Sequence, residues 1–246
     1  TYGMNALTVI VTMDPENGWS HGIHPIPVDT LKAQLKTALS TGVDAIKTGM
    51  LPTVEIIHTA AEAIDSSGLE KVVIDPVLVC KGEDEALFPE NVEAIVKSLL
   101  PRALVVTPNL FEAGQLSGLG TLTTIDDMKR AAAKIHEAGA KNVVIKGGKQ
   151  LQHDKAVDLF FNGSTYTLLE SEKTATTYNH GAGCTFAAAV TANLANGLAV
   201  NESIIEAKKF VSAAIANGWK LNEYVGPVMH GAKNRFGAPE VTTSEV

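Results

Sequence analysis

The sequence predicts an α/β fold in which a mostly parallel central sheet is covered by helices on both faces, giving three layers. Short apolar segments rich in Val, Ile and Leu recur along the first part of the chain, as strands buried on both faces require. Longer segments with apolar residues at helical spacing lie between them. Strand–helix alternation of this kind is typical of parallel sheets. No repeat or linker interrupts it, so we expect a single domain over residues 1–246.

The first part of the chain supplies the parallel strands and the helices that cover them. Strands are predicted over residues 7–12, 45–48, 71–74, 103–106 and 142–145. Helices are predicted over residues 30–40, 53–64, 91–100 and 125–138. In the first of these helices, Leu31, Leu35 and Leu39 fall on one face, which identifies the side that packs on the sheet.

The pattern changes after Lys146. Two further strands, residues 156–161 and 164–169, flank the dipeptide Asn162-Gly163, which is typical of a tight hairpin turn. We therefore expect a small β-hairpin here. Two helices follow, over residues 184–196 and 202–219, and Gly197 is suited to end the first of them.

Composition indicates a globular protein of a reducing compartment. Hydrophobic residues make up 45% of the chain and charged residues 19%, which is ordinary for such proteins. The net charge of −7, without a basic run, argues against nucleic acid as a partner, and no apolar stretch is long enough to span a membrane. Two cysteines, Cys80 and Cys184, are too few for a disulfide framework, so we expect a cytoplasmic protein.

Residues 179–186 (Asn-His-Gly-Ala-Gly-Cys-Thr-Phe) lead into an alanine-rich helix and are the most informative segment. Backbone N–H groups at a helix start lack helical partners and can receive an anion, which glycine allows to come close. Gly181, Ala182 and Gly183 are therefore a candidate anion cradle. Cys184 is a candidate base, because the helix dipole lowers the pKa of a thiol there. The pairing suggests phosphoryl transfer, and the plain alternative is a glycine-rich helix start with a buried cysteine.

Other polar residues also follow predicted strands, where open parallel sheets bind their ligands. Asp75 is either a turn former or a carboxylate for Mg²⁺. Asn109 and Glu112 share one helical face, so they form a capping box or, alternatively, Glu112 holds Mg²⁺ through water. Lys146 is placed to contact phosphate, and the two glycines after it allow a nucleotide to approach.

A further set of residues has weaker local signals. Gly49 and Met50 follow a strand and are either a strand end with a core methionine or a surface for a flat ligand. His180 assists proton movement or contacts phosphate, or it is a polar group with structural partners. His230 lies in a C-terminal turn and is a candidate for the nucleotide pocket, whereas Asp158 is interpreted as structural.

Six motifs, taken in this order, resemble the ribokinase-like superfamily. Within it they resemble the branch of hydroxymethylpyrimidine/phosphomethylpyrimidine kinases and bacterial pyridoxal kinases. The motifs are Lys47-Thr48-Gly49-Met50-Leu51, Asp75-Pro76-Val77, Thr107-Pro108-Asn109-Leu110-Phe111-Glu112, Ile145-Lys146-Gly147-Gly148, Gly181-Ala182-Gly183-Cys184-Thr185-Phe186 and Gly226-Pro227-Val228-Met229-His230. They span nearly the whole chain, and together they are far more specific than any one glycine motif.

The resemblance implies a ribokinase-like fold, a homodimer, and phosphorylation of a hydroxymethyl group on a small heteroaromatic ring with ATP and Mg²⁺. Dependence on a monovalent cation stays open. By position, Gly181, Ala182 and Gly183 form the anion hole. The metal or its waters are held by Asp75 and Glu112. The nucleotide is bound by Asn109, Lys146, Gly148 and His230. The ring pocket is lined by Gly49, Met50 and Val77.

The chain departs from the superfamily pattern in two places. Most ribokinase-like enzymes carry Asp where this chain has Cys184, although cysteine is itself a feature of the pyrimidine and pyridoxal branch. The family's N-terminal strand and its Gly-Ser-Asp segment do not occur in this sequence, so we expect the native protein to contain residues before Thr1.

The segment around His180 resembles the pyridoxal kinases of Gram-positive bacteria more than the pyrimidine kinases. We therefore expect phosphorylation of pyridoxal, pyridoxine or pyridoxamine. Hydroxymethylpyrimidine/phosphomethylpyrimidine kinase is the alternative, and a non-catalytic vitamer-binding protein is the alternative of another class. The polar loops at residues 82–85 and 170–177 are candidates for a lid.

Overall fold

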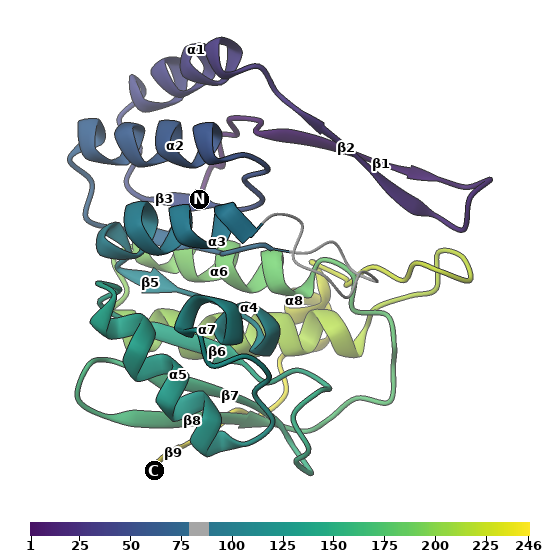
Figure 1. The fold of residues 1–246 in the computed structure, drawn as a ribbon. Helices are drawn as coiled ribbons and strands as arrows, with labels where there is room; N and C mark the ends of the chain where they lie inside the picture. Colours follow the sequence, from purple (N-terminus) through teal and green to yellow (C-terminus); the bar gives the residue numbers. More distant parts are fainter. Residues whose placement is uncertain (79–88) are drawn as a thin grey trace.

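A mixed seven-stranded sheet forms the centre of the computed structural model, which describes residues 1–78 and 89–246 (Figure 1). Its strands, in spatial order, are β3 (Ile46–Thr48), β4 (Val72–Ile74), β5 (Val105–Val106), β6 (Val143–Lys146), β7 (Ala156–Phe161), β8 (Tyr166–Ser171) and β9 (Thr242–Glu245). The pairs from β3 to β6 are parallel, and those from β6 to β9 are antiparallel. These four parallel strands confirm four of the five strands predicted for the first part of the chain.

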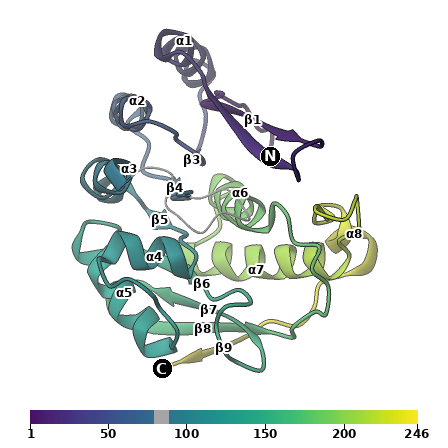
Figure 2. The same ribbon diagram turned by 45° about the vertical axis from the view of Figure 1, so that its right-hand side comes forward.

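Helices lie on both faces of this sheet (Figure 2). One group comprises α1 (Val28–Leu39), α2 (Val54–Ser67), α3 (Pro89–Ala94), α4 (Leu110–Ser117) and α5 (Ile125–Glu137). Helix α3 continues through a π-helical turn (Ile95–Leu99) and a 3₁₀ turn (Leu100–Arg102). The opposite face carries α6 (Ala182–Ala195) and α7 (Val200–Ala216), and α8 (Ala232–Phe236) follows. Within the described ranges, no helix has both the length and the apolar character needed to cross a membrane.

Two apolar cores, one on each face, hold the three layers together. Along β6, Val143 and Ile145 belong to the core under α5, whereas Val144 belongs to the core under α6. Ile135 and Phe186, both fully buried, come from those two helices. The alternation follows from the period of two along a strand and explains why these strands are apolar throughout.

The strand predicted over residues 7–12 is not part of the central sheet. The observed strand β1 (Val9–Asp14) pairs antiparallel with β2 (Ser20–Pro25) in a separate hairpin, which projects from the layers (Figure 1). Ile10 is 49% exposed and Val11 is 39% exposed. An apolar run shows that a segment prefers extended backbone, but it does not show what covers that segment, and so the prediction was wrong.

The hairpin predicted after Lys146 exists, but it extends the central sheet instead of standing apart from it. Strand β7 pairs with β6, so the sheet is mixed to a greater extent than predicted. The turn is longer than two residues, because the Asn162 side chain accepts hydrogen bonds from the backbone of Ser164 and Thr165. Strand β9 was not predicted; its four residues are polar and exposed, so it carries no apolar signal.

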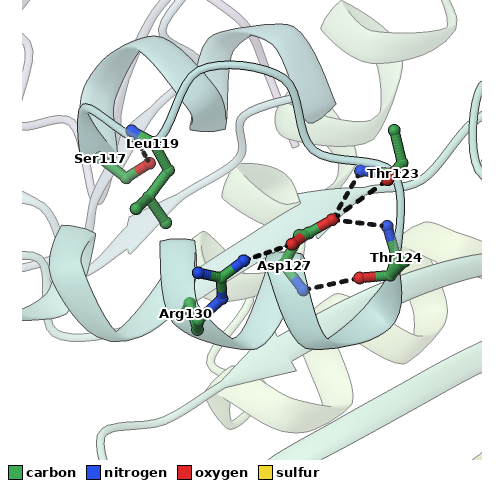
Figure 3. A network of polar contacts seen from close by, with 6 residues as sticks. All are labelled: Ser117, Leu119, Thr123, Thr124, Asp127 and Arg130. Atoms are coloured by element: carbon green, nitrogen blue, oxygen red, sulfur yellow. Dashed lines mark hydrogen bonds and ion pairs between the residues drawn. The ribbon is translucent and has the colours of Figure 1, made fainter.

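A hydrogen-bonded cap fixes the connection between α4 and α5 (Figure 3). The Asp127 carboxylate accepts from the backbone N–H groups of Thr123 and Thr124, and the Thr124 hydroxyl accepts from the Asp127 N–H. These backbone donors, with the Arg130 guanidinium, hold the pKa of Asp127 well below its usual value. The cap sets where α5 begins, and therefore which of its residues meet the sheet.

Candidate active site

Polar side chains from two strands meet at the carboxyl edge of the parallel part of the sheet. Asp75 follows β4, and Lys146 ends β6. The Asp75 Oδ1 atom accepts from Lys146 Nζ at 3.3 Å and from Thr107 Oγ1 at 3.3 Å. Asp75 is only 2% exposed, whereas the Lys146 side chain is 16% exposed, so the carboxylate of this ion pair is buried and the ammonium is partly open to solvent. The prediction that the polar residues after the strands share one edge is confirmed for this pair.

The second oxygen of Asp75 is a candidate ligand for a cation. Oδ2 is buried and has no hydrogen-bond partner among the residues that the structure describes. A buried carboxylate oxygen without a partner is costly, unless a ligand satisfies it. No group of three or more His, Cys, Asp or Glu ligands occurs within residues 1–78 and 89–246. The unpartnered Asp75 oxygen fits Mg²⁺, which is usually held by one or two carboxylates, phosphate oxygens and water.

Glu112 is both a helix cap and a candidate metal residue. Its Oε2 accepts from the Asn109 N–H at 2.8 Å, and Asn109 Oδ1 accepts from the Glu112 N–H at 2.8 Å, so the predicted capping box is confirmed. Burial raises the pKa of Glu112 to about 7, with the Asp75 carboxylate acting in the same direction. Lys146 and the backbone donors of Asn109 and Leu78 oppose the rise. Glu112 is therefore poised to exchange its proton near neutral pH.

We expect Glu112→Gln to stabilise the protein at alkaline pH and to have little effect at acidic pH. The folded protein keeps Glu112 protonated up to about pH 7, whereas the unfolded chain ionises it near 4.5. The wild-type free energy of unfolding therefore falls as pH rises between these values, by ~3 kcal/mol in all. Glutamine imitates the protonated form and removes this loss.

Urea unfolding near pH 5 and near pH 8 tests this expectation. The matched control is Glu202→Gln, since exposed Glu202 accepts from the Ala199 N–H at the start of α7 as Glu112 does from Asn109, although alanine returns no side-chain hydrogen bond. Parallel pH curves for wild type and Glu112→Gln would show that the Glu112 carboxyl is not held protonated.

The Lys146 ammonium lies against the start of α6. A Cβ atom added at Gly183 would come within 3.2 Å of Lys146 Nζ. Burial alone would lower the pKa of Lys146, but the charges of Asp75 and Glu112 outweigh it and raise that pKa. The ammonium is therefore charged at neutral pH. It lies beside the positive end of a helix dipole, so the space next to both favours an anion.

Helix α6 begins two residues earlier than predicted, with Gly181 as its N-cap. Gly181 has a φ of +81°, which favours glycine. The Ala182 N–H donates to the Asn179 carbonyl at 3.1 Å, so it is engaged within the loop. Gly183 and Cys184 occupy the next helical positions, where an α-helix supplies no carbonyl for the N–H. These two amides are the donors best placed for an anion.

Cys184 lies at the surface in the first turn of α6. Partial desolvation, with the charges of Asp75 and Glu112, raises the pKa of its thiol, and Lys47 and Lys146 oppose the rise. The pKa was predicted to be lowered by the helix dipole, so that prediction was wrong in direction. Desolvation is the largest cause of the rise, and it depends on how the fold covers the thiol, which no local sequence pattern shows.

Lys47 is a candidate site residue to which the sequence analysis assigned no role. It lies in β3, its charge acts on Cys184, and a Cβ added at Gly49 would lie 3.1 Å from its Nζ. The signal was weak, because Lys47 lies within the strand, one residue before its end, and not after it as Asp75 does.

The two histidines lie beside the start of α6. The Thr185 hydroxyl lies 3.0 Å from His230 Nε2. The His180 N–H donates to the Gly226 carbonyl, and the His180 carbonyl accepts from the Val228 N–H. The C-terminal motif is thus tied to the anion cradle, although the chemical roles of both histidines stay predictions.

The remaining predicted residues lie around the same edge. The Val77 N–H donates to the Asp75 carbonyl, and the Met50 carbonyl accepts from Thr8 Oγ1 at 2.7 Å. Gly148 follows β6 with a φ of +57°. A cavity of about 1010 Å³ runs along the open side of β3, from Gly49 at the carboxyl edge to Val43 before the strand and Asn196 at the far end of α6.

The binding roles of Gly49, Met50, Val77 and Gly148 stay predictions. Of the two lid candidates, residues 82–85 lie outside the described residues. Residues 170–177 begin within β8, so only the part after Ser171 is a loop.

Comparison with known proteins identifies a family and several relatives of this chain. The chain matches the phosphomethylpyrimidine kinase family model over residues 1–229. It is 58% identical to the pyridoxine kinase of Bacillus subtilis over 232 residues, which cover 94% of this chain and 86% of that protein. It is 37% identical to the hydroxymethylpyrimidine/phosphomethylpyrimidine kinase of the same organism, over 95% of this chain and 86% of that protein.

A solved structure shares the same fold. The pyridoxal kinase from Staphylococcus aureus in complex with AMP-PCP and pyridoxal superposes with a TM-score of 0.94 at 56% identity, covering all of this chain and 88% of that one. The resemblance inferred from the six ordered motifs is confirmed. The chain belongs to the phosphomethylpyrimidine kinase family.

Proposed function

We propose that this protein transfers the γ-phosphoryl group of ATP to the hydroxymethyl group of pyridoxal, pyridoxine or pyridoxamine. The observation that carries the proposal is the partly buried Lys146 ammonium beside Asp75 and the first turn of α6. The Lys146 ammonium and the helix-start amides together suit a phosphate, and we call this arrangement the cradle. Cys184 lies next to it as a base. The relatives named pyridoxine kinase and pyridoxal kinase, at 56–58% identity, support the same substrates here.

Each residue of the cradle then has one task. The hydroxyl oxygen of the substrate attacks the γ-phosphorus, the bond to the β–γ bridging oxygen breaks, and the hydroxyl proton passes to the Cys184 thiolate. The N–H groups of Gly183 and Cys184, with Lys146, bind the charge on the transferring group. Asp75 and Glu112 would hold Mg²⁺, which neutralises phosphate charge when bound.

The binding residues complete the proposal. Nucleotide contacts are proposed for Asn109, Gly148 and His230, and His180 supports the cradle through its loop. Ring contacts are proposed for Gly49, Met50 and Val77, of which Gly49 lines the cavity beside β3.

Phosphorylation assays with pyridoxal and with hydroxymethylpyrimidine, each with ATP and Mg²⁺, test the proposal. We expect kcat/KM to be at least about tenfold higher for pyridoxal than for hydroxymethylpyrimidine. A site whose polar groups form hydrogen bonds with one ring leaves some of its own polar groups unpaired when the other ring binds. Preference for the pyrimidine would assign the protein to the alternative function. Tight binding of pyridoxal with no ADP formed would indicate a vitamer-binding protein.

The pyrimidine kinase is the second candidate because of two specific observations. The matching family model describes a phosphomethylpyrimidine kinase, and a hydroxymethylpyrimidine/phosphomethylpyrimidine kinase is 37% identical. The cradle serves either ring equally well, so only the ring pocket separates the two functions.

We also propose that the protein is a cytoplasmic homodimer that acts on small molecules, with neither nucleic acid nor membrane as a partner. The projecting β1–β2 hairpin leaves Ile10 and Val11 partly exposed, and an exposed apolar surface supports an interface with a second copy (Figure 1). The sequence contains two cysteines, which suits a reducing compartment.

A further inference from the structure

A buried ion pair lies outside the cradle, between α7 and β7. Lys208 Nζ donates to Asp158 Oδ2 at 2.8 Å and to the Ala156 carbonyl at 3.2 Å. The Asp158 and Lys208 side chains are 9% and 6% exposed. Two charges removed from water persist only where the geometry is good and the remaining polar atoms are satisfied. The proposed chemistry makes no direct use of either residue.

The other oxygen of Asp158 connects this pair to the cradle. Asp158 Oδ1 accepts from the Gly147 N–H at 3.1 Å, and Gly147 directly follows Lys146. In the β6–β7 register Lys146 is the partner of Asp158. A Cβ atom added at Gly147 would lie 2.3 Å from the Val157 carbonyl oxygen, so the close approach requires glycine.

The backbone on both sides of the Lys146 side chain is therefore held. The Lys146 N–H donates to the Pro108 carbonyl at 2.9 Å, on the side of α4. The next amide, at Gly147, is held by Asp158 and by the Val157 carbonyl, on the side of β7. Together these bonds set the direction in which Lys146 leaves the strand.

We propose that Asp158, oriented by Lys208, is a positioning residue for Lys146. It fixes the end of β6 so that the ammonium lies between Asp75 and the first turn of α6. The inference rests on the proposed kinase function, in which Lys146 binds the transferring phosphoryl group. Small misplacements of such a group lower kcat strongly, because the group must meet the transition state without reorganising.

Two double variants separate positioning from stability. Asp158→Asn/Lys208→Met removes both charges but keeps a side-chain oxygen for the Gly147 N–H. Asp158→Leu/Lys208→Met removes both charges and that oxygen. The control is Ser171→Ala, which removes a contact of 3.3 Å between the Ser171 hydroxyl of β8 and the Ser212 hydroxyl of α7 in the same layer.

The readouts are kcat and KM for ATP with pyridoxal, the calorimetric affinity for AMP-PCP, and the urea midpoint. We expect the leucine double variant to lose at least about tenfold in kcat and to bind AMP-PCP more weakly. The asparagine double variant is expected to keep most of its kcat and of its affinity for AMP-PCP. Ser171→Ala is expected to change only the urea midpoint. If the leucine variant does not fold, Asp158→Ser/Lys208→Met, whose hydroxyl is too short to reach Gly147, is expected to show the same losses.

Equal kcat and AMP-PCP affinity in all folded variants, with only the urea midpoint lowered, would overturn the inference and leave the pair a structural one. Equal losses in the asparagine and leucine variants would also overturn it, because the bond to Gly147 would then not matter. A wild-type protein without kinase activity would instead refute the proposed function, so the two failures are distinguishable.

Discussion

Replacing Cys184 by alanine is expected to lower kcat by ~10²-fold or more, with a smaller change in KM for ATP. The thiol lies in the first turn of α6, beside the amides that are proposed to receive the transferring group. Removing it removes the acceptor of the hydroxyl proton but leaves Lys146 and Asp75 in place. Steady-state kinetics with pyridoxal would measure the split between kcat and KM. An unchanged kcat in Cys184→Ser near neutral pH would contradict the assignment.

The pH dependence of kcat/KM provides a second test of the role of Cys184. The pKa of the Cys184 thiol is raised, so in the free enzyme the thiolate forms only at alkaline pH. The wild-type kcat/KM is therefore expected to rise with pH through and beyond neutrality, and Cys184→Ala to lose that rise. Cys184→Asp, which restores the residue of most ribokinase-like enzymes, is the informative rescue. It should recover part of kcat and move the rise to lower pH.

Valine at Gly181 or at Gly183 is expected to lower kcat by ~10²–10³-fold while changing ADP affinity much less. A side chain at Gly183 would approach Lys146 Nζ within 3.2 Å and fill the space proposed for the transferring group. At Gly181, the φ of +81° excludes a branched residue without strain and moves the start of α6. Both changes act on the cradle, which is expected to stabilise the transition state more than it stabilises the bound nucleotide.

The matched control is Gly197→Val. Gly197 also has a left-handed backbone, with a φ of +90°, but it follows the other end of α6. Valine there should cost ~1–3 kcal/mol of stability, as at Gly181, without changing kcat per folded molecule. Calorimetry with ADP and urea unfolding would separate the two effects. A Gly183→Val protein that keeps kcat but loses ADP affinity would show that the cradle holds the nucleotide and not the transferring group.

The residues of the cradle could be predicted because their signals are local. A strand, a glycine turn and a helix start each depend on a few consecutive residues. The carboxyl ends of parallel strands lie at the same edge of the sheet. Asp75, Lys146 and the Gly181–Cys184 turn were found in this way. The capping box of Asn109 and Glu112 was also readable, since a cap depends only on residues three apart.

Only the tertiary structure decided the protonation of the site residues and which distant residues contact one another. The pKa of Glu112 and that of Cys184 depend on burial and on carboxylates that are distant in sequence, so neither direction follows from local motifs. Strand β1 pairs with β2 outside the central sheet, although its sequence looks like that of a buried strand. The bond from Asp158 to Gly147 likewise joins two strands through their register. By itself, therefore, the sequence determined which elements form and which residues end them, because those are short-range choices of backbone conformation. The packing of distant elements determined protonation and position, because both depend on distances through space.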